Sequence, residues 1–215
     1  MQFDSKMLQA YLVGGTQDTH YNPTEFLQKV ELAMQSGITA FQYREKGDSR
    51  LTRQERLEMA QRLRKLTHHY HIPYFIDDNE KLALQVGADG VHVGQKDQRI
   101  ETVIRRAAGK LMIGYSCNTP SEIKRANQLT AVDYVGAGPV FPTNSKADAD
   151  PVLGLTKLHQ LVQVSHHPIV AIGGLNPNNV KTTAKTGVVG GAVISMILQS
   201  ENIPQTVNQL RHAFR

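Results

Sequence analysis

Apolar and β-branched residues recur along this chain in short runs, and the segments between the runs repeat apolar positions every three or four residues. Short runs of this kind favour buried strands, and the spacing between them favours helices with one apolar face. Eight runs are found, at residues 10–13, 40–43, 74–76, 90–93, 111–115, 132–135, 169–172 and 192–194. Several are apolar without strict alternation, as in strands covered on both faces. The pattern predicts strands and helices that alternate around a parallel sheet.

Helix-capping sequences support this alternation. Asn22, Thr52 and Thr119 each stand three residues before a glutamate, and a proline follows Asn22 and Thr119 at the first expected helical position. A capping side chain accepts hydrogen bonds from the first turn, and the N–H that proline lacks has no partner there in any case. Asn176 and Pro177 repeat the cap and the proline without the acid, so a helix start is predicted there too.

Eight strand-and-helix units use nearly all of the 215 residues, so residues 1–215 are expected to form a single catalytic domain. The economical α/β architecture is a single (β/α)8 TIM barrel. A doubly wound open sheet is the alternative, and it would favour a glycine-rich fingerprint after the first strand. Gly14 and Gly15 are only a fragment of that fingerprint and are interpreted as a turn.

The charge distribution does not favour a nucleic-acid partner. There are 24 Lys and Arg residues against 19 Asp and Glu residues, a net charge of +5, but the basic residues are scattered among acidic ones. The basic run over residues 53–65 also contains Glu55 and Glu58, and it is predicted to be a solvated helix face. A positive excess does suit phosphorylated substrates, because it raises their local concentration.

Neither a membrane span nor a secretion signal is expected. The longest apolar run, residues 188–198, is shorter than the roughly 20 residues that a bilayer requires. Asp4 and Lys6 interrupt the amino end, which lacks the order of a secretory signal. The single cysteine, Cys117, cannot form an internal disulfide, in agreement with a reducing compartment. We therefore expect a cytoplasmic protein.

The chemistry of a TIM barrel gathers at the carboxyl ends of its strands. Gln42, Arg44 and Lys46 alternate along and just past the second run, so they are predicted to point to one side as a cationic arm suited to a diphosphate. A salt-bridge cluster at the end of a strand is the alternative interpretation of these residues.

Carboxylates follow the next two runs. Asp77 and Asp78 stand at the end of the third run, and Asp97 follows the fourth. Two carboxylates beside substrate phosphates suit Mg²⁺, and no Cys or His stands at zinc-ligand spacing with them. A turn or a helix cap is the alternative for the acidic doublet, but the matching position of Asp97 favours a metal site. His92 alternates with its valine neighbours and is expected in the barrel mouth or its packed interior.

The last three strands predict a second anion site. Glycines after the sixth and seventh runs allow the backbone to approach a ligand, and the loop over residues 142–151 adds hydroxyls and a cation. Backbone N–H groups after strands seven and eight bind phosphate in many barrels. The candidate residues are Thr143, Ser145, Lys146, Gly174, Ile194 and Ser195. Two anion sites in one mouth suit a protein that joins a diphosphate to a monophosphate.

These motifs resemble the thiamine phosphate synthase family over residues 11–198. The resemblance rests on the order and spacing of four blocks, at residues 42–46, 87–97, 133–143 and 171–174. It implies a (β/α)8 barrel that condenses hydroxymethylpyrimidine diphosphate with hydroxyethylthiazole phosphate to thiamine phosphate. It also implies Mg²⁺ as cofactor, release of pyrophosphate, and a dissociative mechanism in which pyrophosphate leaves first.

The resemblance assigns roles to the candidate residues. It implies that Gln42, Arg44 and Lys46 hold the diphosphate, and that Asp78 and Asp97 bind Mg²⁺. Ser116 would contact the pyrophosphate or the pyrimidine. Around the thiazole phosphate and the pyrophosphate, the implied residues are Thr143, Ser145, Lys146 and the backbone of Gly174, Ile194 and Ser195. The groups expected to act in catalysis are Arg44, Lys46, Lys146 and Ser116.

Two positions depart from the family pattern. Asp77 stands where an asparagine is expected to face the pyrimidine, so the missing donor would have to come from a protonated Asp77 or from Asn79. Residues 187–190 replace a Gly-Ala-Asp-Gly pattern. Cys117 has no adjacent base and is interpreted as a small buried residue, not a nucleophile.

Two other functions are compatible with the same barrel. A related thiazole tautomerase would be expected to dispense with Asp78, Asp97 and Lys146, all of which this chain keeps. A non-catalytic phosphate-ligand sensor would need the glycine cradle but not the surrounding cations. The expected partners are the two small-molecule substrates, and a homodimer is the one protein partnership left open.

Overall fold

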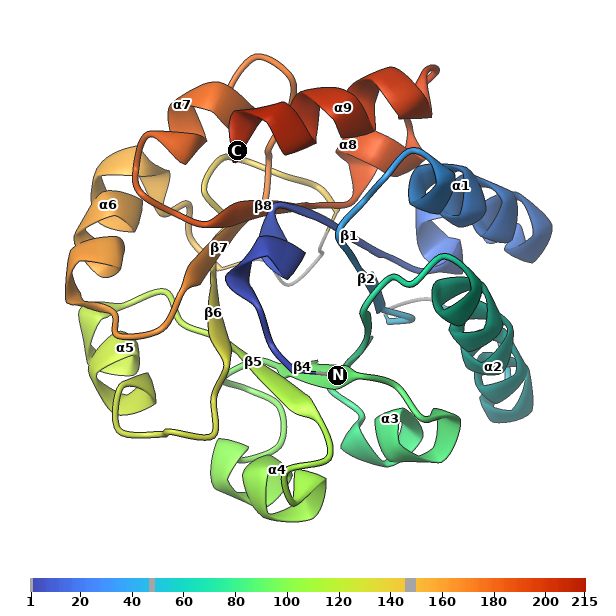
Figure 1. Cartoon of the computed structure of the whole chain (residues 1–215), viewed down its shortest axis with the longest axis horizontal. Helices are drawn as coiled ribbons and strands as arrows, with labels where there is room; N and C mark the ends of the chain where they lie inside the picture. Colours follow the sequence, from blue (N-terminus) through green and yellow to red (C-terminus); the bar gives the residue numbers. More distant parts are fainter. Residues whose placement is uncertain (1, 47–48, 146–149) are drawn as a thin grey trace.

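Eight parallel strands form a closed barrel in chain order in the computed structural model, which describes residues 2–46, 49–145 and 150–215. The strands are β1 (Ala10–Gly14), β2 (Ala40–Tyr43), β3 (Tyr74–Asp77), β4 (Gly90–Val93), β5 (Met112–Ser116), β6 (Tyr134–Ala137), β7 (Ile169–Ile172) and β8 (Gly190–Val193). β8 pairs with β1, which closes the ring seen in Figure 1. The predicted (β/α)8 TIM barrel is confirmed, and the open sheet is not formed.

Helices cover the outside of the barrel (Figure 1). They are α1 (Pro23–Gln35), α2 (Arg53–His69), α3 (Glu80–Val86), α4 (Ile100–Ala107), α5 (Pro120–Ala126), α6 (Gly154–Val164), α7 (Val180–Ala184), α8 (Ser195–Leu198) and α9 (Ile203–Ala213). Two short 3-10 helices, η1 (Ser5–Leu8) and η2 (Thr16–Thr19), flank β1.

Three of the four predicted helix starts are confirmed. Asn22 accepts hydrogen bonds from the first turn of α1, and Thr52 and Thr119 form reciprocal capping boxes with glutamates in α2 and α5. The start predicted at Asn176 is wrong. Asn176 holds a turn instead, since its side chain accepts from Asn178 N at 2.9 Å, and α7 begins only at Val180.

Two strands begin two residues away from their predicted starts, and the limits of the others agree to within one residue. β6 begins at Tyr134, two residues late, because Val132 N still donates to the carbonyl oxygen of Leu129 at 3.0 Å, in the turn that follows α5. β8 begins at Gly190, two residues early. A Cβ atom at Gly190 would lie 1.7 Å from the carbonyl oxygen of Leu8, so only glycine fits where the strand passes this backbone, and glycine gives no apolar signal in the sequence.

Large aromatic rings fill the barrel interior, and glycines make room for them. The rings of Phe75 and Tyr134 meet edge to face with their centroids 5.7 Å apart, and the ring centroids of Tyr11 and Phe75 are 5.5 Å apart. All three side chains are buried. A Cβ atom at Gly114 would lie 2.3 Å from the Tyr134 ring, so the small residue on β5 is required by the large one on β6.

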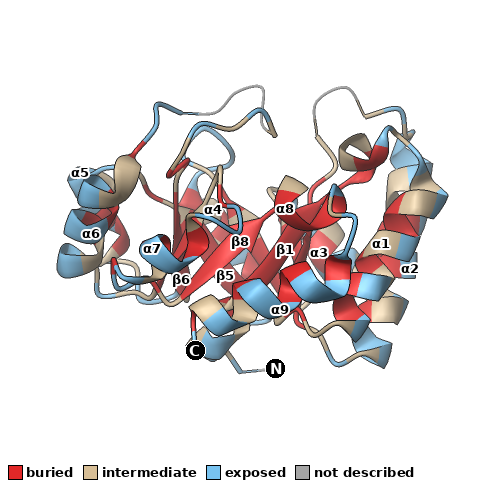
Figure 2. Cartoon of the chain, turned by 90° about the horizontal axis from the view of Figure 1, so that it is seen from above, coloured by how far each residue is buried: buried red, intermediate tan, exposed pale blue. Residues whose placement is uncertain are grey.

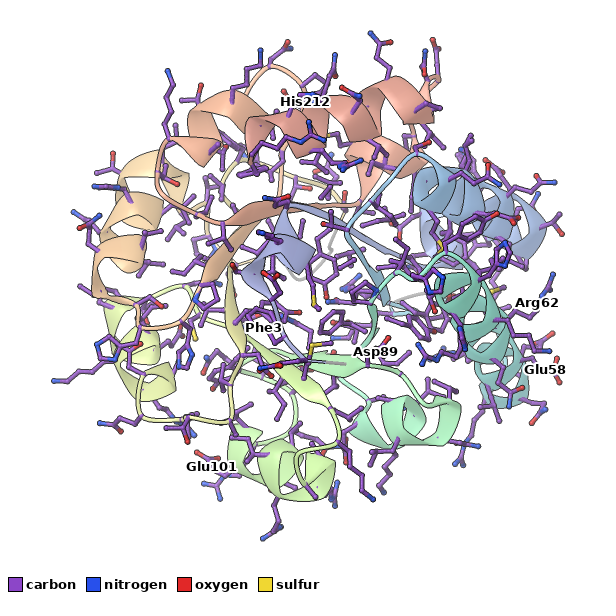
Figure 3. All side chains as sticks on the ribbon, in the orientation of Figure 1. Phe3, Glu58, Arg62, Asp89, Glu101 and His212 are labelled. Atoms are coloured by element: carbon purple, nitrogen blue, oxygen red, sulfur yellow. The ribbon has the colours of Figure 1, made fainter. Side chains whose placement is uncertain are left out.

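The bottom of the barrel, where the strands begin, is closed by the amino-terminal segment. Figure 1 shows η1 lying across the ring of strands, and Figure 2 shows both termini at the side opposite the long βα loops. Phe3, near the middle of the ring in Figure 3, stacks on Tyr134 with ring centroids 6.0 Å apart. The open end of the barrel is therefore the one formed by the carboxyl ends of the strands.

The outer helices carry the charge. Glu58 and Arg62 point away from the barrel on α2 in Figure 3, and both are exposed, as predicted for this basic segment. Across the described ranges, no helix is both long and apolar enough to cross a membrane.

The interior packing predicts a large stability cost for truncating Phe75. We expect Phe75→Ala to lower the free energy of unfolding by about 3–5 kcal/mol, because it removes buried area and leaves a cavity between Tyr11 and Tyr134. Leu84→Ala is the control, since Leu84 is 38% exposed, and its loss should stay under about 1 kcal/mol. Guanidinium unfolding followed by circular dichroism measures both, and equal losses would contradict this account of the core.

Candidate functional site

A cavity opens at the carboxyl ends of the strands. Its empty volume is about 1150 Å³, counting the part open to solvent. Eleven of the predicted site residues line it: Arg44, Lys46, Asp77, Asp78, Asp97, Ser116, Thr143, Ser145, Gly174, Ile194 and Ser195. The structure thus brings together side chains from β2 through β8, as expected for the rim of a barrel.

One predicted residue is placed differently, and another is not among the described residues. Gln42 is 4% exposed and lies below the cavity, where its Nε2 donates to the Tyr11 hydroxyl at 2.8 Å. Gln42 points to the same side of β2 as predicted for Arg44 and Lys46, but its amide group is buried in the barrel interior. Lys146 lies outside the described residues.

The cationic arm meets the predicted carboxylates directly. Lys46 Nζ forms an ion pair with Asp78 Oδ2 and lies 3.6 Å from carboxylate oxygens of both Asp77 and Asp97. Arg44 Nε lies 3.3 Å from Asp77 Oδ2, and both of these side chains are 8% exposed. The two interpretations of the arm therefore coincide here, because a salt-bridge cluster is present and it lies in the cavity wall.

Crowding of these carboxylates sets their protonation. Burial and the neighbouring charge of Asp77 raise the pKa of Asp78 to about 8, and Asp78 also hydrogen-bonds Asp97. Burial opposes ionisation of Asp97 as well, but the hydrogen bond to Asp78 and the charge of Lys46 lower its pKa overall. Burial alone would lower the pKa of Lys46, yet attraction to the three carboxylates raises it. A raised pKa for Asp78 and a lowered pKa for Asp97 favour a proton on Asp78, which hydrogen-bonds Asp97 beside the ammonium group of Lys46.

This arrangement fits a divalent cation that is completed by a ligand. Asp78 and Asp97 are close enough to hydrogen-bond, and both converge on the one cationic group of Lys46. Two carboxylates, with phosphate oxygens and waters, are a typical Mg²⁺ set. Among residues 2–46, 49–145 and 150–215, no cluster of three or more His, Cys, Asp or Glu side chains is placed to hold a metal by protein groups alone.

Glu45 fastens the cationic arm to the preceding loop. Its carboxylate accepts Thr16 N at 2.9 Å, Thr16 Oγ1 at 2.5 Å and Ser49 Oγ at 2.6 Å. Gln17 Nε2 donates to the carbonyl oxygen of Arg44 at 2.7 Å. These contacts hold the backbone on both sides of Arg44, so its guanidinium and the neighbouring Lys46 extend from a fixed point.

Hydroxyl groups and a glycine turn gather at the other side of the rim. Ser145 Oγ lies 3.5 Å from Ser195 Oγ, and Ser145 N donates to Thr143 Oγ1 at 3.2 Å. Gly174 has a φ of +68°, and a Cβ atom there would lie 2.6 Å from the carbonyl oxygen of Pro142. Only glycine permits this close approach of the β6–α6 and β7–α7 loops.

Asn118 and Asp150 also line the cavity, and the sequence analysis missed them. Asn118 Nδ2 donates to Asp150 Oδ2 at 3.0 Å, and Asn118 Oδ1 accepts Gly138 N at 2.9 Å. Lys96 Nζ donates to Asp150 Oδ1 at 3.1 Å. Three βα loops are therefore connected through one carboxylate. No short motif could have found Asp150, because its partners are 32 and 54 residues away.

Cys117 is fully buried beside the cavity, and its thiol is held inert. Burial raises the pKa of this thiol to about 12, with a further contribution from the charge of Glu122. The thiol therefore stays protonated at neutral pH, in agreement with its interpretation as a packing residue.

Comparison with known proteins identifies relatives over the full length of the chain. A family model described as thiamine monophosphate synthase matches residues 10–197. A thiamine-phosphate synthase of Limosilactobacillus reuteri is 52% identical over 215 residues, covering 100% of both chains, and one of Limosilactobacillus fermentum is 52% identical over 210 residues, covering 98% of both. Among solved structures, a thiamine phosphate pyrophosphorylase from Pyrococcus furiosus superposes with a TM-score of 0.84 and 34% identity, covering 98% of this chain and 96% of that one.

The environment of Cys117 predicts very slow thiol labelling. With a pKa of about 12, the thiolate fraction at pH 8 is on the order of one in ten thousand, and burial also blocks access. We expect a chromogenic disulfide reagent to label the native protein far more slowly than the same protein in guanidinium chloride, where one thiol per chain should react. Equal rates in the two conditions would show that the thiol is exposed or activated.

Proposed function

This chain belongs to the thiamine monophosphate synthase family, and we propose that its barrel mouth condenses hydroxymethylpyrimidine diphosphate with hydroxyethylthiazole phosphate. The protein is then a transferase that moves the pyrimidinylmethyl group from the diphosphate oxygen to the thiazole nitrogen. The observation that supports this assignment is the convergence of Arg44, Lys46, Asp78 and Asp97 in one wall of the cavity. Binding of a diphosphate together with a divalent cation would require such a combination of positive groups and a carboxylate pair.

The two substrates are assigned to opposite sides of the rim. The charged wall belongs to β2, β3 and β4, whereas the hydroxyl and glycine wall belongs to β6, β7 and β8, which lie across the closed ring. Thr143 and Ser145 would donate to the thiazole phosphate, together with the backbone N–H groups of Gly174, Ile194 and Ser195. The pyrimidine diphosphate would occupy the charged side. Both substrates then face one another across a single cavity.

The proposed reaction breaks the bond between the methylene carbon and the diphosphate oxygen before the new bond forms. The electron pair leaves with the oxygen, and the lone pair of the thiazole nitrogen then forms the C–N bond. No protein nucleophile is required. Arg44, Lys46 and Lys146 would neutralise the charge that grows on the leaving diphosphate, and Ser116 would donate a hydrogen bond to it. Holding the thiazole within attack distance supplies the rest of the rate enhancement.

Mg²⁺ is the cofactor proposed for this site, held by Asp78 and Asp97. When bound, it would supply positive charge to the diphosphate oxygens. A role for the ion is supported by the raised pKa of Asp78 beside Asp97, since groups that resist joint ionisation without a cation are suited to binding one. Lys46 is then available to the diphosphate.

Asp77 would face the pyrimidine in place of the asparagine expected there. Asn79 is not proposed as a substitute, because it does not line the cavity and its side chain caps α3, with Oδ1 accepting Leu82 N at 2.9 Å. The ion pair with Arg44 holds the Asp77 carboxylate in the cavity wall. We propose that it accepts a hydrogen bond from the amino group of the pyrimidine.

The synthase assignment accounts for the charged wall better than the two alternatives do. A tautomerase uses neither a diphosphate nor a metal, and a sensor has no leaving group to stabilise. Neither would require Lys46 beside three carboxylates. The single-domain organisation of residues 1–215, the cytoplasmic location and a homodimer stay predictions.

The function is tested by incubating the purified protein with both substrates and Mg²⁺. We expect thiamine phosphate and pyrophosphate to form in equal amounts, because each new C–N bond releases one diphosphate. Omission of either substrate in turn is the control, and neither product should then accumulate beyond the rate without enzyme. Failure to form thiamine phosphate with both substrates present would overturn the assignment.

The metal assignment predicts a specific response to Asp78→Asn. We expect the Mg²⁺ concentration for half-maximal turnover to rise at least about tenfold, because one of two anionic ligands is lost. Asp150→Asn is the matched control: it removes a carboxylate from the same cavity but outside the Lys46 cluster. An unchanged Mg²⁺ titration for Asp78→Asn, or an equal shift for Asp150→Asn, would remove Asp78 from the ligand set.

A further inference from the structure

A chain of hydrogen bonds runs through the barrel interior and ends at Ser116. Gln42 Nε2 donates to the Tyr11 hydroxyl at 2.8 Å, which lies 2.9 Å from the Tyr134 hydroxyl. The Tyr134 hydroxyl lies 3.1 Å from His92 Nδ1, and His92 Nε2 lies 2.9 Å from Ser116 Oγ. Its members stand on β2, β1, β6, β4 and β5. The chain thus leads from beneath the cationic arm to a hydroxyl in the cavity wall.

The number of available hydrogens decides which group donates and which accepts in each of these hydrogen bonds. The Tyr11 oxygen already accepts from Gln42, so the Tyr11 hydrogen is free to donate to Tyr134, and the Tyr134 hydrogen to His92 Nδ1. The opposite direction would leave the Tyr11 hydrogen without an acceptor among the described residues. Tyr11 is 1% exposed, and a buried hydroxyl hydrogen without an acceptor is unfavourable. The first direction is therefore favoured.

Both tyrosines remain donors at neutral pH. Burial raises the pKa of Tyr11 and of Tyr134 well above the usual range, so neither phenol ionises. His92 Nδ1 then accepts from Tyr134, which leaves the imidazole neutral with its hydrogen on Nε2. That hydrogen is donated to Ser116 Oγ at 2.9 Å. The hydrogen of Ser116 is consequently left for another acceptor, and Ser116 lines the cavity.

Packing holds the rings of Tyr134 and His92 in place within this hydrogen-bond relay, which runs from Gln42 to Ser116. Phe3 stacks on Tyr134 from the closed end of the barrel, and Phe75 meets the Tyr134 ring edge to face. A Cβ atom at Gly114 would lie 2.4 Å from His92 Nδ1, and one at Gly136 would lie 2.9 Å from His92 Cε1. Glycines on β5 and β6 therefore admit the imidazole at the position from which it reaches Ser116.

We propose that Tyr134 is a positioning residue, which fixes the Nε2–H tautomer of His92 and thereby directs the Ser116 hydroxyl hydrogen toward the diphosphate. This inference rests on the proposed function, because it takes the diphosphate as the acceptor. The stabilisation is needed most when charge develops on the leaving oxygen. Loss of the relay should therefore lower kcat and leave the KM values for both substrates nearly unchanged.

The first test compares two tyrosine variants that each lose one buried hydroxyl. Tyr134→Phe removes the donor to His92 and should lower kcat roughly 10- to 100-fold, the range typical of lost supporting hydrogen bonds at active sites. Tyr11→Phe is the matched control, because the Tyr134 hydroxyl keeps His92 as its acceptor, and its kcat should fall far less. Chemical unfolding of both variants measures the stability effect separately. Equal kcat losses in the two variants would overturn the proposal.

The second test asks whether Tyr134 acts through Ser116. In a Ser116→Ala background there is no hydroxyl to direct, so adding Tyr134→Phe should change kcat less than about twofold. A purely structural role of Tyr134 would give the same fold-loss with and without Ser116. Such additive losses would contradict the proposal even if Tyr134→Phe alone is slow.

Nitrogen-15 NMR of histidine-labelled protein gives a readout that needs no activity. We expect His92, assigned by the signal that disappears in His92→Gln, to show one neutral Nε2–H tautomer near neutral pH. In Tyr134→Phe it should become a mixture, because Nδ1 has lost its donor. An Nδ1–H tautomer or an imidazolium in the unmodified protein would overturn this inference. If thiamine phosphate does not form at all, the proposed function fails, and the NMR result still decides the tautomer.

Discussion

Closure of eight parallel strands brings the carboxyl ends of β2, β3 and β4 to one rim, and there Lys46 has to balance three carboxylates. Arg44 adds a second cation through its contact with Asp77. Three acidic groups against two cations leave one negative charge, and the raised pKa of Asp78 favours a proton that compensates it. Because these groups are partly buried, their interactions are stronger than they would be in water. The protonation of Asp78 and Asp97 therefore depends on which other cation or anion binds beside them.

Under the proposed function, this balance is what makes the site responsive to its ligands. Asp78 and Asp97 would hold a divalent cation, which would supply positive charge in place of a proton, and a diphosphate would give Lys46 and Arg44 new anionic partners. Described residues beside these groups already have hydrogen-bond partners on neighbouring loops. Glu45 fixes the arm after β2 to the loop after β1. Asp150 links the loops after β4, β5 and β6. Little reorganisation is then required when substrates bind, which is the basis of electrostatic preorganisation.

The barrel interior obeys a different constraint, since hydroxyls buried among aromatic rings must find partners there. The hydroxyls of Tyr11 and Tyr134 hydrogen-bond each other, and each forms a second hydrogen bond, Tyr11 with Gln42 and Tyr134 with His92. A network whose members all have partners has a defined direction and rigid geometry. In this protein it ends at Ser116 in the cavity wall, so core packing and the geometry of the site are set by the same contacts.

The sequence by itself determined the features that depend on near neighbours. Strand runs, capping boxes and the placement of Lys46, Asp78 and Asp97 at strand ends follow from local spacing and from the rule that parallel strands end at one rim. Where local chemistry was ambiguous the prediction failed, as at Asn176, whose side chain stabilises a turn before α7.

Only the tertiary structure decided which groups meet across the ring. It turned the amide of Gln42 to Tyr11 and away from the cavity, and it paired Tyr11 with Tyr134, which is 123 residues away. It also joined Asn118 to Asp150 across 32 residues. These contacts arise from the closure and register of the barrel, so no pattern within a single strand or loop contains them.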